Sequence, residues 1–125
     1  MAHVLVVEDN LPYRKLLGYR LEQFGHTACL TENGIEALKV LEHTHFDLAI
    51  LDISMPDMDG LTLLMSIRET PETATLPVMM LTASALDAHQ MMADELHANL
   101  YMQKYVSSNE LREAVEKLLS VTQTP

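Results

Sequence analysis

Apolar residues fall into two kinds of segment along this chain, short unbroken runs and longer stretches with helical spacing. Residues 4–7, 48–51 and 78–81 are continuous apolar runs, without polar alternation. Such runs are typical of strands that are covered on both faces in a parallel sheet. Residues 27–31 and 99–103 are weaker strand candidates. The pattern therefore predicts five strands, three of them deeply buried.

Helical spacing of apolar residues follows each strand candidate. Pro12 and Gly25 bracket the first predicted helix, and Asn33 is the expected N-cap of the second. Ser107 and Glu110 have capping-box spacing before the fifth. The predicted buried stripes consist of Tyr13, Leu16, Leu17, Leu21 and Phe24; Ile35, Leu38 and Leu41; Leu61, Leu64 and Met65; Ala88, Met91, Met92 and Leu96; and Leu111, Val115, Leu118 and Leu119.

Strict alternation of strand and helix predicts an α/β fold, a doubly wound and mostly parallel sheet with helices on both faces. We expect one domain over residues 2–119, and residues 120–125 as a C-terminal tail or linker. Ligands of such sheets bind beyond the carboxyl ends of the strands. The residues at those ends are therefore the first candidates for function.

Charge and cysteine usage narrow the class of protein. The 125 residues are 48% apolar and 21% charged, which is enough for a real core. With 18 acidic residues against 8 Lys and Arg, the formal net charge is −10, which argues against direct binding to nucleic acid or an anionic membrane. The single cysteine, Cys29, lies in a predicted buried strand and is expected to be inert. One unpaired cysteine fits a reducing, cytoplasmic setting.

Polar groups of complementary chemistry stand at four strand ends. Glu8 and Asp9 follow the first strand, Asp52 the third, Thr82 the fourth and Lys104 the fifth. If the first and third strands are neighbours, about 4.8 Å apart, three carboxylates crowd one pocket. Like charges at ~4 Å repel by about 4 kcal/mol per pair at an effective dielectric near 20.

A divalent cation would relieve this repulsion. Carboxylate-rich oxygen ligands favour a hard ion, and Mg²⁺ usually leaves room for a phosphoryl oxygen. Together with the Lys104 ammonium and the Thr82 hydroxyl, these groups suit phosphoryl transfer, with Asp52 as the nucleophile. Taken singly, each residue is more ordinary: an acid at a strand end often caps a helix, and a lone lysine is usually a surface residue.

These residues resemble a known family. The runs at residues 6–10, 51–60, 82–83 and 101–104 are similar to the receiver domain of bacterial two-component response regulators. The resemblance extends over residues 2–119, and it implies a flavodoxin-like sheet of five strands in the order 2-1-3-4-5 with five helices. The segment that begins at Asp52 and ends at Gly60 is its most specific part.

The resemblance also implies roles for individual residues. Asp52 matches the phosphoacceptor that takes a phosphoryl group from a sensor histidine kinase or phosphotransfer protein. Glu8, Asp9 and Asp52, with the backbone carbonyl of Ser54, match the Mg²⁺ ligands. Lys104 matches the lysine that contacts the phosphate.

Two further matches imply a switch and an output surface. Thr82 matches the switch hydroxyl, and Tyr101 matches the aromatic switch residue. The implied output is a downstream protein, or a dimer, bound through the fourth helix, fifth strand and fifth helix. The chain would act as a phosphoacceptor that assists its own chemistry and not as an enzyme.

Two positions depart from the family pattern. Tyr105 follows Lys104 where proline is usual, often with a cis bond, so an altered loop is expected there. His97 stands where glycine is usual, so the fourth helix is expected to end differently. Neither residue supplies a group that phosphoryl chemistry requires.

Other functions remain open on the residues alone. A phosphatase of the haloacid dehalogenase type uses the same groups, but it needs an acid two residues after the nucleophile, where this chain has Ser54. A flavodoxin-like nucleotide binder needs a phosphate loop after the first strand, where Glu8 and Asp9 would repel the anion. A degenerate receiver that binds partners without phosphorylation is the remaining alternative.

Overall fold

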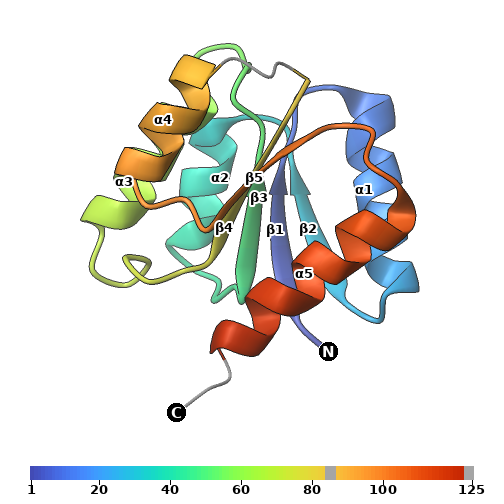
Figure 1. The fold of residues 1–125 in the computed structure, drawn as a ribbon. Helices are drawn as coiled ribbons and strands as arrows, with labels where there is room; N and C mark the ends of the chain where they lie inside the picture. The colour runs from blue at the N-terminus through green and yellow to red at the C-terminus, as the bar shows by residue number, and fades with distance from the viewer. Residues whose placement is uncertain (84–86, 123–125) are drawn as a thin grey trace.

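The predicted alternation of strands and helices is present (Figure 1). The structure, a computed structural model, describes residues 1–83 and 87–122. The strands are β1 (His3–Val7), β2 (Thr27–Thr31), β3 (Leu48–Leu51), β4 (Val78–Thr82) and β5 (Leu100–Gln103). The helices are α1 (Leu11–Gln23), α2 (Gly34–Leu41), α3 (Gly60–Glu69), α4 (Asp87–Glu95) and α5 (Ser108–Thr122).

All neighbouring strands are parallel, in the order β2-β1-β3-β4-β5. This confirms the predicted doubly wound, flavodoxin-like sheet. The register places Val7 beside Leu51 and Thr82 beside Gln103. The loops that follow β1, β3, β4 and β5 therefore leave the sheet at the same end, which is the upper end in Figure 1.

Each face of the sheet carries its own core. Alternate residues of the apolar runs point to opposite faces, so both faces of the central strands are buried. Helices α1 and α5 cover one face, with Leu17, Leu21 and Val115 among the buried residues. Helices α2, α3 and α4 cover the other, with Leu63 and Ile67 buried there. The continuous runs at residues 4–7, 48–51 and 78–81 are fully covered, as predicted.

Hydrogen bonds confirm the predicted caps at Asn33 and Ser107, and they show that Asn10 caps α1. The Asn10 side chain accepts from the Tyr13 amide, and the Asn33 side chain accepts from the Glu36 amide. The Ser107 hydroxyl accepts from the Glu110 amide, which is one half of the predicted capping box. Each bond satisfies an amide that the first helical turn leaves without a backbone partner.

Five large apolar residues assigned to buried stripes are exposed, and these assignments are wrong. Small residues lie at the helix–sheet contacts instead: Gly18 approaches Leu30, and Ala37 and Ala93 are fully buried. Small residues let a helix approach the sheet closely. The most buried position on such a helix can therefore hold a small residue, while larger apolar residues beside it remain exposed. The exposed residues are Leu16, Ile35, Met65, Met91 and Met92; the side chain of Ala88 lies outside the described ones.

Strand β2 lies at an edge of the sheet, so it is less buried than predicted. Cys29 is only half-buried and Leu30 is exposed, because only one side of β2 pairs with another strand. Cys29 was expected to lie in a buried strand, and its side chain is instead only partly buried. Burial and the charge of Glu36 raise the pKa of the Cys29 thiol, which keeps it protonated at neutral pH.

Helix α5 continues past the expected end of the domain. Its stripe of Leu111, Val115, Leu118 and Leu119 is buried, as predicted. The helix extends to Thr122, so the first residues of the expected tail are helical, and residues 123–125 lie outside the described ones. Within the described residues, no helix has both the length and the apolar character needed to cross a bilayer.

Candidate functional site

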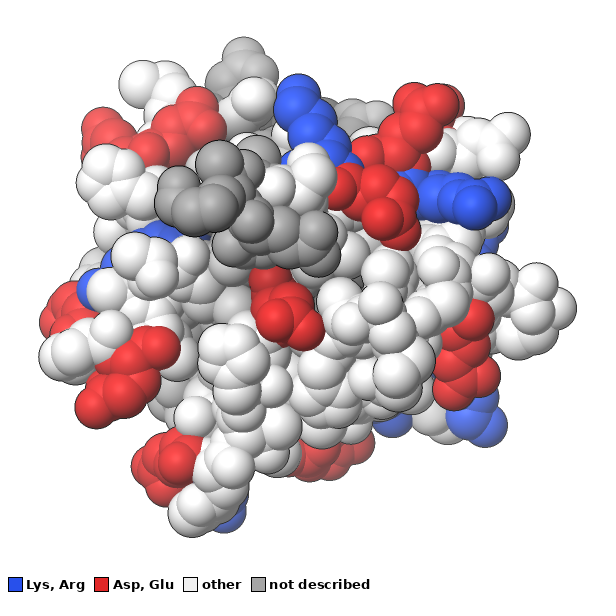
Figure 2. Space-filling model, turned by 90° about the horizontal axis from the view of Figure 1, so that it is seen from below, with Lys and Arg blue, Asp and Glu red and all other residues white. Residues whose placement is uncertain are grey.

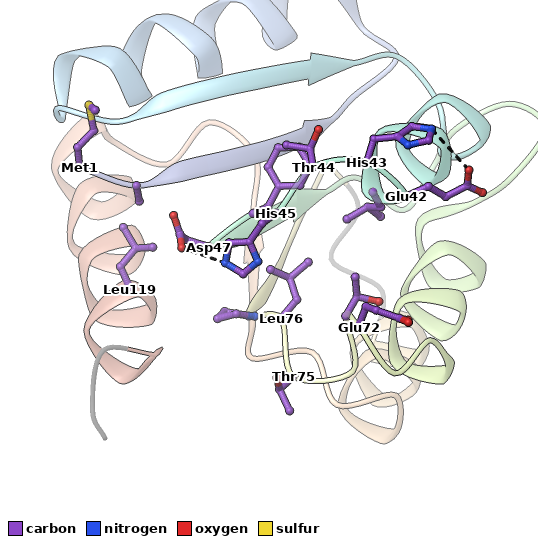
Figure 3. Close-up of a pocket in the computed structure, with 15 residues that line it drawn as sticks. Met1, Glu42, His43, Thr44, His45, Asp47, Glu72, Thr75, Leu76 and Leu119 are labelled. Atoms are coloured by element: carbon purple, nitrogen blue, oxygen red, sulfur yellow. Dashed lines mark ion pairs between the residues drawn. The ribbon is translucent and has the colours of Figure 1, made fainter.

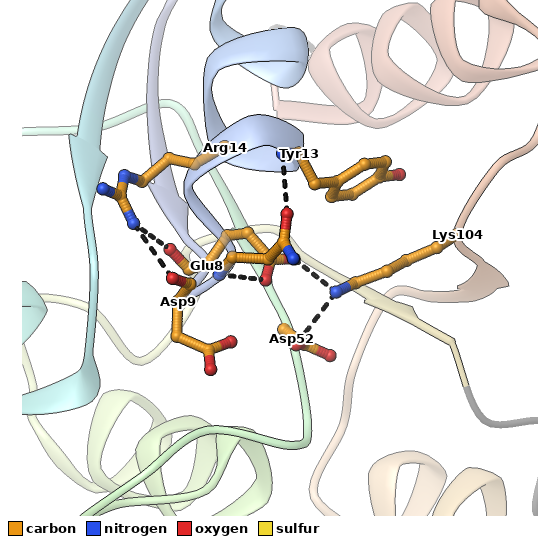
Figure 4. Close-up of polar contacts among 7 residues, drawn as sticks. Glu8, Asp9, Tyr13, Arg14, Asp52 and Lys104 are labelled. Atoms are coloured by element: carbon orange, nitrogen blue, oxygen red, sulfur yellow. Dashed lines mark hydrogen bonds and ion pairs between the residues drawn. The ribbon is translucent and has the colours of Figure 1, made fainter.

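Three carboxylates meet at the carboxyl ends of β1 and β3, as the sequence predicts (Figure 4). One ligand oxygen from each of Glu8, Asp9 and Asp52 lies within 4.8 Å of the others. Glu8 and Asp52 are only 1% and 4% exposed, whereas Asp9 is exposed. The site therefore combines two buried acids with one at its mouth.

The loop after β1 is held by hydrogen bonds that fix Glu8 and Asp9. The Asn10 amide donates to Glu8 Oε2 at 3.0 Å, while the Asn10 side chain caps α1. The Arg14 guanidinium donates to the backbone carbonyl of Glu8 at 2.8 Å and to that of Asp9 at 3.4 Å. The start of α1 thus orients both acids.

The loop after β3 depends on a glycine. The Asp52 amide donates to the Val7 carbonyl, and the Gly60 amide donates to the Ile53 carbonyl at 2.8 Å. A Cβ atom on Gly60 would lie 2.0 Å from the backbone oxygen of Asp52, closer than any side chain can approach. Gly60 therefore lets the start of α3 pack directly against the backbone of Asp52.

Lys104 reaches across from the end of β5 and pairs with both buried acids. Its Nζ lies 2.7 Å from Glu8 Oε1 and 3.2 Å from Asp52 Oδ2. The Lys104 amide donates to the Thr82 carbonyl at 2.7 Å, which extends the pairing of β4 and β5 to the site. The ammonium is largely buried, so it provides a positive charge inside the acidic pocket.

Burial dominates the electrostatics of the two inner acids. It raises the pKa of Glu8, and the neighbouring charge of Asp52 adds to the increase. Burial also raises the pKa of Asp52 even though the Lys104 ammonium opposes the increase. Burial disfavours the charged lysine too, yet its bond to Glu8 and the charge of Asp52 raise the pKa of Lys104. The ionised acids are therefore held in the fold at a cost in free energy.

The other predicted site residues lie at or near the same end of the sheet. The Thr82 side chain is buried at the end of β4, and Ser54 is exposed in the loop that follows Asp52. Tyr101 lies on β5 opposite Met80, half-buried against the core that α2, α3 and α4 cover. Burial raises the pKa of the Tyr101 hydroxyl. The structure therefore brings Glu8, Asp9, Asp52 and Lys104 together, with Thr82 linked to Lys104 through its backbone.

Tyr105 takes the place of the usual proline with a left-handed backbone. The Lys104–Tyr105 peptide is trans, and Tyr105 has φ 68°. Its side chain is 77% exposed. The altered loop that was expected here is therefore present.

His97 also adopts a left-handed backbone, with φ 64°. The Ala98 amide donates to the Ala93 carbonyl and the His97 amide to the Asp94 carbonyl, which is the bond pattern of a Schellman cap. The expected change at the end of α4 is wrong, because histidine here adopts the conformation that glycine favours.

Sequence reasoning missed two residues of the site, Tyr13 and Arg14. Tyr13 was assigned only to the buried stripe of α1, yet the Lys104 ammonium lies 5.0 Å from the centre of its ring. Both residues lie in the first turn of a helix that begins beside the acids. That position in the sequence could have indicated them, although their partners come from distant parts of the chain.

A separate hollow of about 550 Å³ lies at the opposite end of the strands (Figure 3). His45 lies 3.6 Å from Asp47 and His43 lies 4.0 Å from Glu42, and both histidines are largely exposed. Figure 2 looks onto this end, where acidic groups are scattered over a mostly uncharged surface. The hollow contains none of the predicted site residues.

The doubly wound sheet, with clustered acids and a lysine at its carboxyl end, matches a family of signalling domains. Residues 4–116 match the response regulator receiver domain family. The chain therefore belongs to this family of two-component signalling domains.

Known proteins of this family include both longer and similar-sized relatives. A probable transcriptional regulator of Cyanophora paradoxa is 33% identical over 98% of this chain and 50% of its own length. An uncharacterized 14.6 kDa protein of Leptolyngbya boryana is 37% identical over 91% of this chain and 87% of its own. The chain thus spans about half the length of several curated relatives that it matches.

Solved structures share the fold over nearly the whole chain. The receiver domain of a signal transduction histidine kinase from Syntrophus aciditrophicus is 30% identical, with a TM-score of 0.92, and the match covers 100% of this chain and 95% of that one. A receiver domain of a sensor histidine kinase from Pseudomonas aeruginosa is 25% identical, with a TM-score of 0.88 over 95% of this chain and 98% of that one. The latter holds a magnesium ion coordinated in its active site cleft.

Proposed function

We propose that the chain is a phosphoacceptor signalling module in which Asp52 takes a phosphoryl group from a sensor histidine kinase or a phosphotransfer protein. The observation that carries this proposal is the placement of Asp52 between two acids and Lys104. Burial alone would favour the protonated, neutral form of a carboxylic acid. An acid beside a metal site and an ammonium can instead remain ionised and act as a nucleophile.

The donor set fits a divalent cation. When ionised, Glu8, Asp9 and Asp52 carry three negative charges, and Lys104 supplies one positive charge. The two negative charges left equal the charge of Mg²⁺, and oxygen-only ligands suit that ion. Glu8, Asp9, Asp52 and the Ser54 carbonyl would hold it, and when bound it would offset charge on the phosphoryl oxygens. The magnesium in the related Pseudomonas domain supports this assignment.

The transfer step uses the residues of this chain as follows. A carboxylate oxygen of Asp52 attacks phosphorus, and the bond from phosphorus to the donor imidazole nitrogen breaks. The electron pair of that bond goes to the nitrogen, which takes a proton from solvent. The Lys104 ammonium then attracts the phosphoryl oxygens. The same groups would assist hydrolysis of the acyl phosphate. The chain would therefore limit the lifetime of its own phosphorylated state, without being an enzyme for another substrate.

The readout would pass through Thr82 and Tyr101 to a protein surface. Thr82 ends β4 beside the site, and Tyr101 lies on β5 two residue pairs before the pair Thr82–Gln103. A shift of the Thr82 hydroxyl toward the phosphoryl oxygens would alter the room available to the Tyr101 ring. The surface formed by α4, β5 and α5 would then bind a downstream protein or a second copy of the chain.

Phosphorylation with acetyl phosphate and Mg²⁺, followed by mass spectrometry of peptides, tests this proposal. We expect one acyl phosphate, on Asp52, which disappears in excess chelator and in Asp9→Ala. Asp59→Asn is the matched control, because Asp59 caps α3 outside the acidic cluster. Full labelling of Asp52→Asn would overturn the assignment. Binding of a partner without any labelling would favour a degenerate receiver, and turnover of added phosphoesters would favour a phosphatase.

A further inference from the structure

Lys104 has a second environment besides the two acids. Its Nζ lies 2.7 Å from Glu8 Oε1 and 3.2 Å from Asp52 Oδ2 on one side. The centre of the Tyr13 ring lies 5.0 Å from the same atom (Figure 4). This distance is within the range at which the negative face of an aromatic ring attracts an ammonium. The position of Lys104 therefore depends on an uncharged group as well as on two charged ones.

The Tyr13 ring has little freedom to move. It is 5% exposed, and it belongs to the first turn of α1, where its amide donates to the Asn10 side chain. The Tyr105 ring packs edge-on against it, with ring centres 5.5 Å apart and planes at 64°. Tyr105 reaches this contact from a left-handed backbone directly after Lys104. The loop that carries the lysine thus also carries the ring that supports Tyr13.

The hydroxyl of Tyr13 is not the group that faces the acids. Burial raises the pKa of Tyr13, and the backbone of Tyr105 opposes that increase, which places the hydroxyl near Tyr105. Among the described residues, this hydroxyl is buried without a hydrogen bond of good geometry. In Figure 4 it points away from Asp52. The ring itself, and not the hydroxyl, is therefore the part of Tyr13 that acts on Lys104.

We propose that Tyr13, supported by Tyr105, is a positioning residue that keeps the Lys104 ammonium within reach of Asp52 during phosphoryl transfer. A cation held by the acids would compete with Lys104 for the oxygens of Glu8 and Asp52. The ring of Tyr13 carries no net charge and is no ligand for such a cation, so its attraction for Lys104 persists. This inference rests on the proposed function of Asp52.

Two substitutions of Tyr13 separate the ring from the hydroxyl. Tyr13→Phe keeps the ring, and Tyr13→Met keeps an apolar side chain of comparable length without an aromatic face. We expect Tyr13→Met to slow phosphorylation by acetyl phosphate about 3–30-fold, the range that a partly to fully buried cation–π contact implies. Tyr13→Phe should restore most of the rate. Tyr19→Leu is the control on the same helix, because Tyr19 is 61% exposed and remote from these contacts.

A readout without phosphorylation distinguishes positioning from a merely structural role. In the metal-free protein, the ring current of Tyr13 should shift the NMR signals of the Lys104 ε-methylene protons upfield. The shift should persist in Tyr13→Phe and vanish in Tyr13→Met. The affinity for Mg²⁺ alone should be unchanged in both variants, because Tyr13 is outside the acidic cluster.

The outcomes separate the two proposals. If wild type is not phosphorylated at all, the proposed function fails, whereas the methylene shifts still report whether the ring meets the lysine. If Tyr13→Met loses the shift but is phosphorylated at the wild-type rate, the positioning role is overturned. Unshifted methylene protons in wild type would overturn it as well. If Tyr13→Met does not fold, Tyr105→Ala provides the comparison, because it removes only the exposed ring that packs against Tyr13. A lost methylene shift with an unchanged phosphorylation rate in this variant would again overturn the proposal.

Discussion

At the scale of single residues, Gly60 sets how closely α3 approaches Asp52, the proposed phosphoacceptor. We expect Gly60→Ala to destabilise the fold by about 2–3 kcal/mol and to reduce labelling of Asp52, because its Cβ would lie 2.0 Å from the Asp52 backbone oxygen. Gly18→Ala is the matched control, since its Cβ would meet only the flexible end of Leu30, at 3.1 Å. Its effect should stay below about 1 kcal/mol. Urea denaturation measures both, and equal losses would contradict the special role of Gly60.

The charge of Asp52 works against the fold in the absence of metal. Burial raises the pKa of Asp52, so the neutral isostere in Asp52→Asn should stabilise the metal-free protein, while Lys104 keeps its bond to Glu8. We expect Tm to rise by about 3–5 °C, corresponding to ~1 kcal/mol in a domain of this size. Thermal denaturation with and without Mg²⁺ checks this, and Mg²⁺ should stabilise wild type more than the variant.

The net charge of the chain requires a matched control for that result. Because the chain carries −10, removal of any acid could raise Tm by reducing general repulsion. Asp94→Asn makes the same change in charge at an exposed residue of α4. A comparable rise in this variant would attribute the effect to net charge and not to the site.

Cys29 provides a prediction about pH. Its thiol has a pKa raised from the ordinary value of 9.0 by burial and by Glu36. The folded protein therefore binds the thiol proton more tightly than the unfolded chain, and this contribution to stability is lost as pH rises above 9.0 through the folded pKa. Alkylation by iodoacetamide should be slower in the native protein than in urea, with a pH midpoint above 9.0. A midpoint at or below that value would contradict the prediction.

At the scale of elements, the end of α4 carries avoidable strain. His97 has φ 64°, a conformation that costs most residues about 1 kcal/mol more than it costs glycine. We expect His97→Gly to stabilise the protein by about 1 kcal/mol, since the Arg68 guanidinium binds the backbone carbonyl of residue 97 and not its side chain. Asp94→Gly, inside the same helix, should lose about 0.3 kcal/mol, because the helix propensity of glycine is only slightly below that of Asp. Urea denaturation measures both, and a loss in each would show that the His97 side chain has a role of its own.

The apolar pattern predicted the elements better than it predicted their buried faces. Helix starts follow from local chemistry, as the caps at Asn10 and Asn33 show. The centre of a buried stripe depends on how closely the helix approaches the sheet, which small residues such as Ala37 and Ala93 permit. Their low hydrophobicity conceals that role in the sequence, so larger neighbours such as Ile35 and Met91 were assigned to the core in error.

At the scale of the whole molecule, the sequence predicted which residues lie together at the site, but it did not predict which side chains Lys104 contacts there. The acids and Lys104 could be assigned to one end of a parallel sheet because the apolar runs show where each strand ends. How closely Lys104 approaches Glu8 and Asp52 depends on side-chain conformations across three strands. The contact of Tyr13 with Lys104 depends in addition on the left-handed backbone of Tyr105. No local pattern encodes these relations.

The hydrogen bonds of Arg68 lead to a prediction about which parts of the molecule respond to the proposed phosphorylation of Asp52. Arg68, on α3, donates to the carbonyls of Leu76 and His97 and to the side chain of Asn99, whose oxygen also accepts from the Val78 amide. These bonds join the loops that precede β4 and β5 at the end of the sheet opposite Asp52. We therefore expect this end to act as a fixed point, while the carboxyl ends of β4 and β5 respond.

Beryllofluoride, a mimic of the phosphoryl group, tests this division by amide NMR in the presence of Mg²⁺. We expect the largest shifts at Lys104 and along β5 at Tyr101, because the Lys104 amide is bonded to the Thr82 carbonyl beside the site. Shifts at residues 43–47 and at Asn99 should be small. In Arg68→Ala the fixed point is lost, so shifts should spread to Asn99, whereas Arg112→Ala, an exposed arginine on α5, should leave the wild-type pattern unchanged. Equal shifts at both ends of the sheet in wild type would show that phosphorylation moves the domain as a whole and that Arg68 anchors nothing.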